Sequence, residues 1–189
     1  MKISIAVFLS LILASFNCYA IKCNEQSQAY KSLGEKYYEL EDPKPLTSEQ
    51  ANAIRTVFEN IAGRELVGSG RFIECIGPGT TAKKQTSREK LSGKLSLFSD
   101  SSFTLALEIY TPKTKVRSLN TSHYPNQNQA YTITHPGKNT LVINSRMRRK
   151  KTFIEDNVEF NVSGRQLNVV ITRYIHGHFA FQIERKLTV

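Results

Sequence analysis

Apolar residues recur with two different periods along the chain, and the change falls near Leu66. Upstream of Leu66, four apolar residues follow the i, i+3, i+4, i+7 spacing of one helix face. A capping box at Thr47 and Gln50 predicts where this helix begins, and Gly63 predicts where it ends. The pattern therefore predicts one amphipathic helix. Its apolar stripe consists of Ile54, Val57, Phe58 and Ile61.

From Leu66 to Val189 the apolar period is two, which is typical of half-buried β-strands. Clusters of Gly, Pro, Asn and Asp separate the runs and predict turns, including one at Glu155 to Asn157. No helical crossover fits between the runs, so we expect antiparallel pairing of sequential strands. We predict a mainly β fold, an antiparallel up-and-down β-barrel of about eight strands with an N-terminal helix or helices, because closure removes the sheet edges. A two-sheet sandwich is the alternative.

The interior of such a barrel holds either side chains or one small ligand. Alternate apolar positions of the predicted strands would point inward and line that interior. The predicted ligand-binding residues are Leu105, Leu107, Ile143, Phe160, Val169 and Phe181. The alternative is that core packing fills these positions completely and leaves no cavity.

The first twenty residues have the pattern of a secretory signal peptide. Lys2 precedes an apolar run from Ile3 to Phe16, and the small residue Ala20 stands where a peptidase would cut. The run is shorter than the roughly 20 residues that a membrane-spanning helix needs. A retained anchor, or a lipid-bearing Cys18, is the alternative. We predict a signal peptide at 1–20, an N-terminal arm at 21–46, and a helix plus β-barrel domain at 47–189. The mature protein would be secreted, to a periplasm or outside the cell, with no transmembrane segment.

Removal of the signal peptide leaves two cysteines, Cys23 and Cys75. In an oxidising compartment an even pair predicts one disulfide, which would tie the arm to the barrel across a loop of about fifty residues. Two unpaired buried thiols are the alternative.

The chain is basic, with 26 Lys and Arg against 16 Asp and Glu and a formal charge of +10. The densest cluster is the basic patch Arg146, Arg148, Arg149, Lys150 and Lys151. Such a patch attracts an acidic protein, a polysaccharide or an anionic lipid surface, whereas a solvated strand edge is the structural alternative. Nucleic acid is not expected, because no aromatic-rich binding motif accompanies the patch. If about eight strands alternate in direction, the patch and the turn at His176 to His178 share one end of the barrel. The connection at Gly77 to Thr86 then lies at the other end, as part of the pocket mouth.

Metal and catalytic signals are weak. His176 and His178 are two residues apart, which would place both rings on one strand face, but no further Cys or His spacing supports a metal. The chain has no nucleophile elbow, phosphate-binding loop, dinucleotide fingerprint or zinc-protease motif. We therefore expect no cofactor, no resident metal and no catalytic residue, and hence a non-enzymatic protein. An enzyme with a metal held near His176 and His178 is the alternative.

Several features together resemble the calycin-like barrels, the secreted lipocalin and avidin types. These features are the N-terminal helical stretch, the step Gly70-Arg71-Phe72 at the first strand, the longer first connection at Gly77 to Thr86, and the strand meander. The resemblance implies a barrel that holds a small apolar ligand. The leading hypothesis is therefore a secreted binding protein for a small apolar or amphipathic ligand. The alternative is a secreted interaction module, an inhibitor or surface binder that recognises an acidic partner through a basic barrel end.

Overall fold

The structure is a computed structural model that describes residues 22–40, 47–77, 82–97, 104–110, 117–122 and 129–189. The predicted signal peptide lies outside these residues. The helical elements are α1 (Gln28–Leu33), the 3-10 helix η1 (Gly34–Tyr38) and α2 (Ser48–Phe58). The strands are β1 (Glu65–Ile76), β2 (Lys83–Leu97), β3 (Thr104–Tyr110), β4 (Arg117–Ser122), β5 (Gln129–Gly137), β6 (Thr140–Arg149), β7 (Thr152–Ser163), β8 (Gln166–Ile175) and β9 (His178–Thr188). Within the described ranges, none of the helices is both long and apolar enough to cross a membrane.

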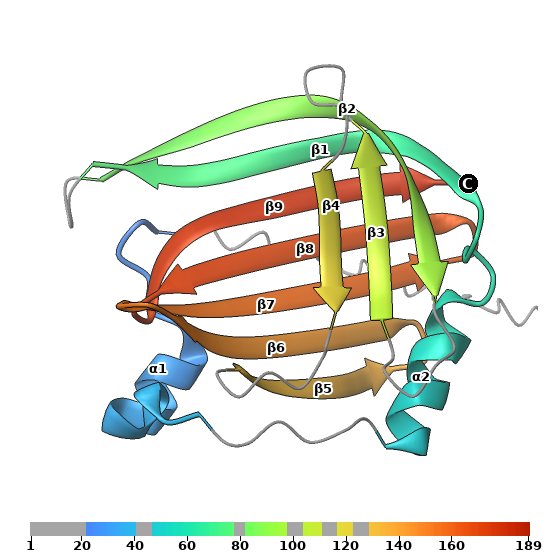
Figure 1. Cartoon of the computed structure of the whole chain (residues 1–189). Coiled ribbons are helices and arrows are strands. Elements are labelled where there is room, and N and C mark those ends of the chain that lie inside the picture. The colour runs from blue at the N-terminus through green and yellow to red at the C-terminus, as the bar shows by residue number, and fades with distance from the viewer. Residues whose placement is uncertain (1–21, 41–46, 78–81, 98–103, 111–116, 123–128) are drawn as a thin grey trace, which may run out of the picture.

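The nine strands of the described residues belong to one curved antiparallel sheet in the order β4-β3-β2-β1-β9-β8-β7-β6-β5 (Figure 1). This confirms the predicted mainly β, antiparallel fold with N-terminal helices. The first strand, β1, pairs with the last, β9, as a barrel requires. The sheet nevertheless stays open, because no strand pair in the described part of the chain joins β4 to β5. Nine alternating strands leave β4 and β5 running in the same direction, so an antiparallel ladder cannot close the ring.

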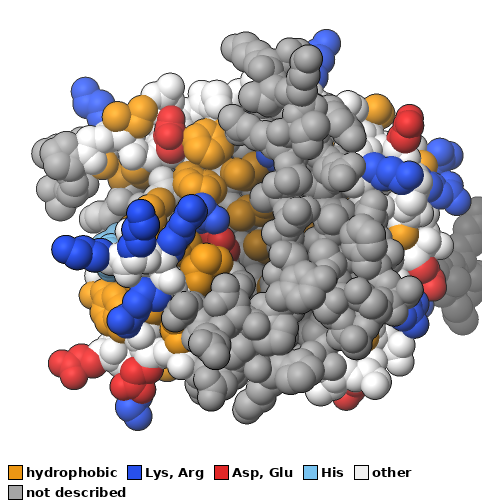
Figure 2. Space-filling view, in the orientation of Figure 1, with side chains coloured by type: hydrophobic (Ala, Val, Ile, Leu, Met, Phe, Trp, Pro, Cys, Tyr) orange, Lys and Arg blue, Asp and Glu red, His pale blue; other side chains and the backbone are white. Residues whose placement is uncertain are grey.

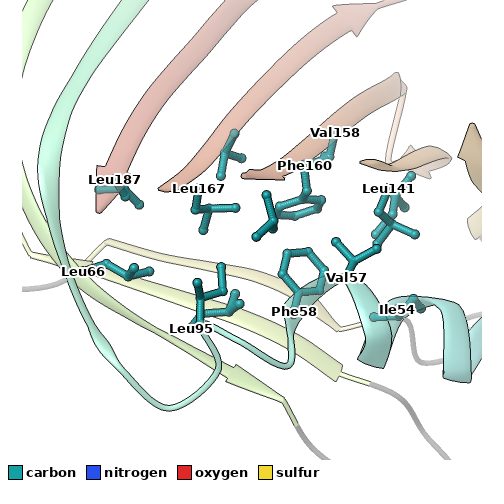
Figure 3. Close-up of a cluster of buried hydrophobic side chains, with 14 of the residues drawn as sticks. Ile54, Val57, Phe58, Leu66, Leu95, Leu141, Val158, Phe160, Leu167 and Leu187 are labelled. Carbon is teal, nitrogen blue, oxygen red and sulfur yellow. The ribbon is translucent and has the colours of Figure 1, made fainter. Parts of the chain in front are cut away.

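Helix α2 covers one end of the concave face of the sheet. The predicted capping box is present: Gln50 N donates to Thr47 Oγ1 at 3.2 Å, and Thr47 N donates to Gln50 Oε1 at 3.0 Å. The helix ends at Phe58, and turns continue to Gly63, whose N–H donates to the Leu95 carbonyl at 2.9 Å. Figure 3 shows the apolar stripe of α2 facing side chains of β1 and β2 on one side and of β6 to β9 on the other. This cluster comprises Ile54, Val57, Phe58, Ile61, Leu66, Leu91, Leu95, Leu141, Ile143, Val158, Phe160, Val162, Leu167, Val169, Ile171 and Leu187.

The two ends of the sheet differ in what lies against them. We call the end beside α2 the α2 end; the turns at 138–139 and 164–165 lie there. At the opposite end, the α1 end, lie the turns at 150–151 and 176–177, the last residues of β1 and the first residues of β2. The basic patch and the histidine turn thus share an end, as predicted. Residues 78–81 of the predicted connection at Gly77 to Thr86 lie outside the described residues, but the strand ends that flank them are at this same end rather than the other. The prediction assumed that successive connections alternate between the two ends of the sheet. It failed because β5 begins at the opposite end from the one where β4 stops, so the strand ends that flank the connections before β4 lie at the opposite end of the sheet from the one predicted.

The N-terminal arm packs on the convex face at the α1 end. Phe179 N donates to the Glu25 carbonyl at 2.8 Å, and Ser27 N donates to the Gly177 carbonyl at 2.9 Å, so the arm briefly extends the sheet beside β9. Cys23 and Cys75 form the predicted disulfide, with Cα atoms 5.6 Å apart. The arm is therefore attached both covalently and by backbone hydrogen bonds.

Candidate functional site

The predicted lining residues separate into three groups. Ile143, Phe160 and Val169 are buried in the core beneath α2, where protein side chains already fill the space around them. Leu105 and Leu107 lie on β3, opposite Leu97 and Leu95, and their side chains fall outside the described part of the structure. Phe181 lies on the concave face towards the α1 end, beyond the reach of α2. Among the predicted lining residues whose side chains are described, Phe181 is the one outside the core cluster, and it is half-buried.

An arginine and a carboxylate meet on this part of the concave face. Arg173 of β8 lies directly opposite Asp156 of β7, two positions from the core pair of Ile171 and Val158. Its Nε donates to Asp156 Oδ1 at 2.6 Å and its Nη2 to Oδ2 at 2.7 Å. The Arg173 side chain remains 36% exposed. These hydrogen bonds raise the pKa of Arg173 above its ordinary value, so the guanidinium stays charged.

Aromatic rings support the same guanidinium. Arg173 Cζ lies 5.1 Å from the ring centroid of Phe181, a cation–π distance. The Phe72 ring of β1 in turn lies 5.4 Å from the Phe181 ring. Arg173 is thus fixed by a carboxylate at its edge and by an aromatic ring at its face, while part of its surface stays accessible.

Apolar side chains continue from this arginine to the ends of the strands. Ile154 of β7 lies opposite both Met147 of β6 and Ile175 of β8, so these three share the concave face. Figure 2 shows hydrophobic side chains at the α1 end with Lys and Arg side chains around them and an acidic side chain among them. We define the concave site as Arg173 and Asp156 with the surrounding Phe72, Phe181, Met147 and Ile154.

Turn propensity hid Asp156, which the sequence pattern placed in a turn and not in this site. The expected turn at Glu155 to Asn157 is wrong, because β7 runs through it and the turn lies at 150–151. The available signal was register: Asp156 continues the inward series of Val158 and Phe160, and Arg173 continues that of Val169 and Ile171. A charge in such a series marks a site where the concave face turns polar.

The basic patch divides between two roles. Arg146 Nη1 donates to the Tyr37 carbonyl at 2.9 Å, and Arg148 Nη2 donates to the Tyr38 carbonyl at 3.1 Å. These carbonyls end η1, where arginine side chains satisfy otherwise unbonded groups. The remaining members of the patch, Arg149, Lys150 and Lys151, are exposed at the α1 end. Two of the five predicted cations therefore hold the arm.

The two histidines flank a turn against which the arm packs. His178 lies 5.6 Å from the Tyr30 ring and His176 lies 6.4 Å from the Tyr38 ring. Between them, Gly177 has φ of 80°, and a Cβ there would overlap the Tyr30 ring. Among the described residues no group of three His, Cys, Asp or Glu side chains could hold a metal ion.

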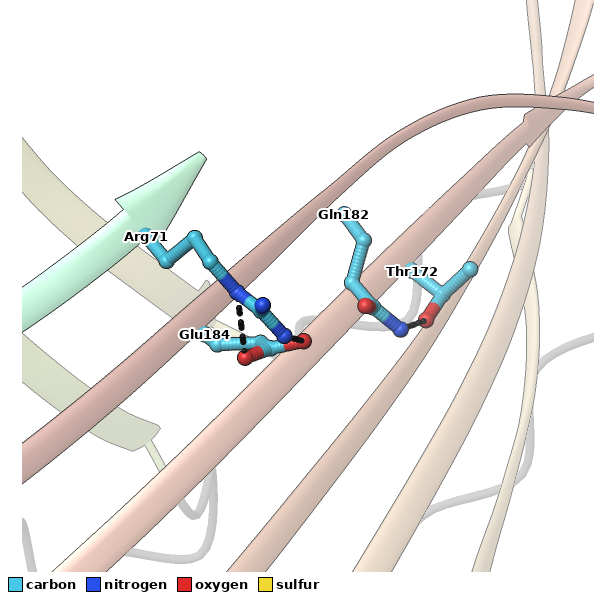
Figure 4. A network of polar contacts seen from close by, with 4 residues as sticks. All are labelled: Arg71, Thr172, Gln182 and Glu184. Carbon is cyan, nitrogen blue, oxygen red and sulfur yellow. Dashed lines mark hydrogen bonds and ion pairs between the residues drawn. The ribbon is translucent and has the colours of Figure 1, made fainter. Parts of the chain in front are cut away.

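The convex face carries polar contacts that stabilise the fold. Arg71 donates to Glu184 from Nε at 2.9 Å and from Nη2 at 2.6 Å, and Gln182 Nε2 donates to Thr172 Oγ1 at 3.1 Å (Figure 4). The Arg71 side chain is 34% exposed, nearly as much as Arg173. The Arg71 pair is thus a matched counterpart, on the other face, of the pair in the concave site.

A buried carboxylate anchors the arm to this convex face. Ser27 Oγ donates to Glu155 Oε2 at 2.5 Å and accepts from Tyr30 N at 3.0 Å, so the N-cap of α1 also binds the sheet. Asn144 Nδ2 donates to Glu155 Oε1 at 3.1 Å. The Tyr37 ring is buried, and its centroid lies 4.9 Å from the centroid of the Phe153 ring. No local sequence pattern indicated this network, because Ser27 and Glu155 are 128 residues apart.

Two tyrosines, Tyr37 of the arm and Tyr174 of β8, predict a loss of stability at alkaline pH. Burial, then the charge of Glu155, raises the pKa of Tyr37 above its ordinary value of 10.0. Burial, with the charges of Glu25 and Glu155, raises the pKa of Tyr174 to about 12. Above about pH 10 the unfolded chain releases phenol protons that the folded chain keeps, so the free energy of unfolding should fall as the pH rises towards 12.

Urea unfolding at about pH 8 and about pH 11 tests this linkage. A variant carrying Tyr37→Phe and Tyr174→Phe should lose less stability between the two pH values than the wild type. Lysine titration contributes equally to both proteins and cancels in the comparison. Parallel losses in the two proteins would contradict the prediction.

Comparison with known proteins gives a distant structural likeness. No family model matches the chain, and neither does any curated protein. Among solved structures, it is similar to the S-type phycobiliprotein lyase CPES from Guillardia theta, with a TM-score of 0.43 and 10% sequence identity over 76% of this chain and 97% of that one. The expectation of a non-enzymatic protein is contradicted by this neighbour, which is named a lyase. At this distance, the likeness gives no activity to the present chain.

Proposed function

We propose that the protein is secreted and binds a small amphipathic molecule with an anionic head at the concave site. The observation that carries this proposal is the partly exposed Arg173, held against Phe181 on the half of the concave face that α2 does not cover. The anionic head would contact Arg173, and the apolar part would lie along Phe72, Ile154 and Met147. Sites for small molecules commonly combine an apolar lining with a few fixed polar groups.

The geometry of Arg173 suits this role. The Asp156 carboxylate accepts hydrogen bonds from Nε and Nη2 of Arg173. A guanidinium carries further N–H donors, which can bind a second carboxylate or a phosphate. Its side chain needs no reorganisation on binding, since Asp156 and Phe181 already orient it. Arg173 would therefore act as a preformed anchor.

Secretion remains a proposal supported by the disulfide and the leader pattern. A bond between Cys23 and Cys75 persists in an oxidising compartment and would be reduced in most cytosols. The N-terminal sequence of the protein recovered from its host culture tests this part, with Ile21 expected as the first residue. Recovery of a chain that still begins at Met1 would contradict it.

Binding of dodecanoate, compared with uncharged dodecanol, tests the ligand site. Calorimetry should show that the wild type binds dodecanoate more tightly than dodecanol, and that Arg173→Met weakens dodecanoate binding about tenfold or more while changing dodecanol binding little. Arg71→Met removes an equally exposed, carboxylate-paired arginine from the convex face and is the matched control. It should leave both affinities unchanged.

Two results would overturn the proposal. Equal effects of Arg173→Met and Arg71→Met would show that the concave arginine has no special role. Absence of binding to both dodecanoate and dodecanol by folded wild-type protein would remove the amphipathic ligand itself. Circular dichroism of each variant establishes that the fold is retained.

A further inference from the structure

We propose that the strand ends around the concave site dock the protein onto an anionic lipid bilayer. This docking surface, the rim, consists of Ile76 and Ile175 with Lys83, Lys84, Arg149, Lys150 and Lys151. The inference goes beyond the proposed function, because it concerns a partner surface and not the molecule held inside. It follows from the apolar exposure and the positive charge that the fold brings to the α1 end.

The apolar part of the rim is unusually accessible for aliphatic side chains. Ile76 is 51% exposed and Ile175 is 40% exposed. Ile76 ends β1 and Ile175 ends β8, and both are in register with concave-face positions of their strands. Scattered exposed aliphatic residues are ordinary, but these two end β1 and β8, the strands on either side of β9. Exposed aliphatic side chains at strand ends can insert into the outer part of a bilayer.

The charge of the rim complements an anionic membrane. Lys83 lies directly opposite Ile76, and Lys84 follows it. Arg149, Lys150 and Lys151 form the end of β6 and the adjoining turn, and all five cations are exposed. Two carboxylates lie on the concave face inside the rim: Glu74 is opposite Phe181, and Asp156 is paired with Arg173. The five cations of the rim outnumber them. Figure 2 shows the same association of Lys and Arg side chains with hydrophobic ones at this end.

A lipid surface fits this combination better than a soluble acidic partner does. An acidic protein or polysaccharide would contact the cations and leave the two isoleucines in water. A bilayer offers phosphate and other anionic headgroups to the cations and acyl chains to the isoleucines at once. The concave site opens at the same end, so a docked protein would present it to the membrane.

Sedimentation with vesicles tests the proposal on the full mature chain with its disulfide intact. The protein should bind vesicles of phosphatidylcholine containing about one third phosphatidylglycerol, and bind pure phosphatidylcholine vesicles weakly. Lys150→Glu with Lys151→Glu should weaken binding about tenfold or more. The matched control is Lys138→Glu with Arg165→Glu, which makes the same charge change in exposed hairpin turns at the α2 end and should retain clearly tighter binding than the rim variant.

A second pair of variants tests insertion of the isoleucines. Ile76→Ser with Ile175→Ser should weaken vesicle binding, whereas Val67→Ser, at a 61% exposed position of β1 near the α2 end, should not. If the isoleucine variant binds as the wild type does while the charge variant fails, the rim recognises an anionic polymer surface and the bilayer proposal is wrong. Equal binding to neutral and anionic vesicles would also overturn it.

The rim and the concave site can fail separately. Arg173→Met should keep wild-type vesicle binding, since Arg173 lies inside the rim and not on it. Loss of vesicle binding in Arg173→Met, with the fold intact, would show that the concave site and not the rim makes the contact. The dodecanoate measurement is made without vesicles, so its result does not depend on docking.

Discussion

Replacing Phe58 with alanine is expected to lower the free energy of unfolding by about 3–5 kcal/mol. Phe58 is the last residue of α2 and is fully buried. Its ring lies 5.3 Å from the Phe160 ring in an edge-to-face arrangement, between the helix and the concave sheet. Truncation would remove this apolar surface from the core and leave a cavity, because the sheet on one side and α2 on the other cannot both collapse into it.

Urea or guanidinium unfolding measures this loss, with Phe58→Leu and Thr56→Ala as comparisons. Phe58→Leu keeps most of the apolar volume and should cost clearly less than Phe58→Ala. Thr56 is an exposed residue of the same helix, and its replacement should change stability by at most about 0.5 kcal/mol. A loss below about 1 kcal/mol for Phe58→Ala would mean that α2 does not close this end of the core.

Removing the disulfide is expected to cost about 4 kcal/mol, the second large effect. Cys23 and Cys75 are 52 residues apart, so the bond restricts a long segment of the unfolded chain and lowers its conformational entropy. In the folded protein, the arm keeps its other attachments, including the Ser27 contact with Glu155 and the arginine contacts with η1. The loss should therefore act mainly through the unfolded state.

The double variant Cys23→Ala/Cys75→Ala, made in a chain that starts at Ile21, isolates this effect, since it leaves no free thiol. Its midpoint in denaturant should fall, while native circular dichroism stays close to that of the wild type. Reduction of the wild type should lower stability by a similar amount. An unchanged midpoint would indicate that the unfolded chain is already restrained without the bond; loss of native spectra would indicate that the arm needs the bond to dock.

The fold class followed from local patterns because those patterns act over a few residues. The capping box at Thr47 and Gln50 and the stripe that includes Phe58 specify α2 in whatever context they occur. Alternation specifies strands in the same way, and short turns specify antiparallel neighbours. Closure of the ring is different, because it depends on the parity of the strand count and on the direction in which β5 starts, which no local pattern records.

The candidate site shows the same division. Alternation placed Phe181 on an inward face, and it lies in the concave site. Alternation also marked Phe160 as inward, but only the position of α2 decides that Phe160 is covered and Phe181 is not. Asp156 was interpreted as part of a turn because turn propensity is a local property. Its pairing with Arg173, which makes a charged residue acceptable inside a strand, is a tertiary contact.

By itself, the sequence determined the β-strands, the amphipathic helix, the pairing of Cys23 with Cys75 and the concentration of positive charge. Each of these depends on residue type and short-range spacing, or, for the cysteines, on the predicted removal of Cys18 with the signal peptide. Only the tertiary structure decided which half of the concave face α2 fills, which arginines hold the arm, and that Arg173 is left partly accessible beside aromatic rings. Those outcomes depend on side chains that are far apart in sequence and compete for the same space and the same hydrogen bonds, so they are fixed only when the whole chain packs.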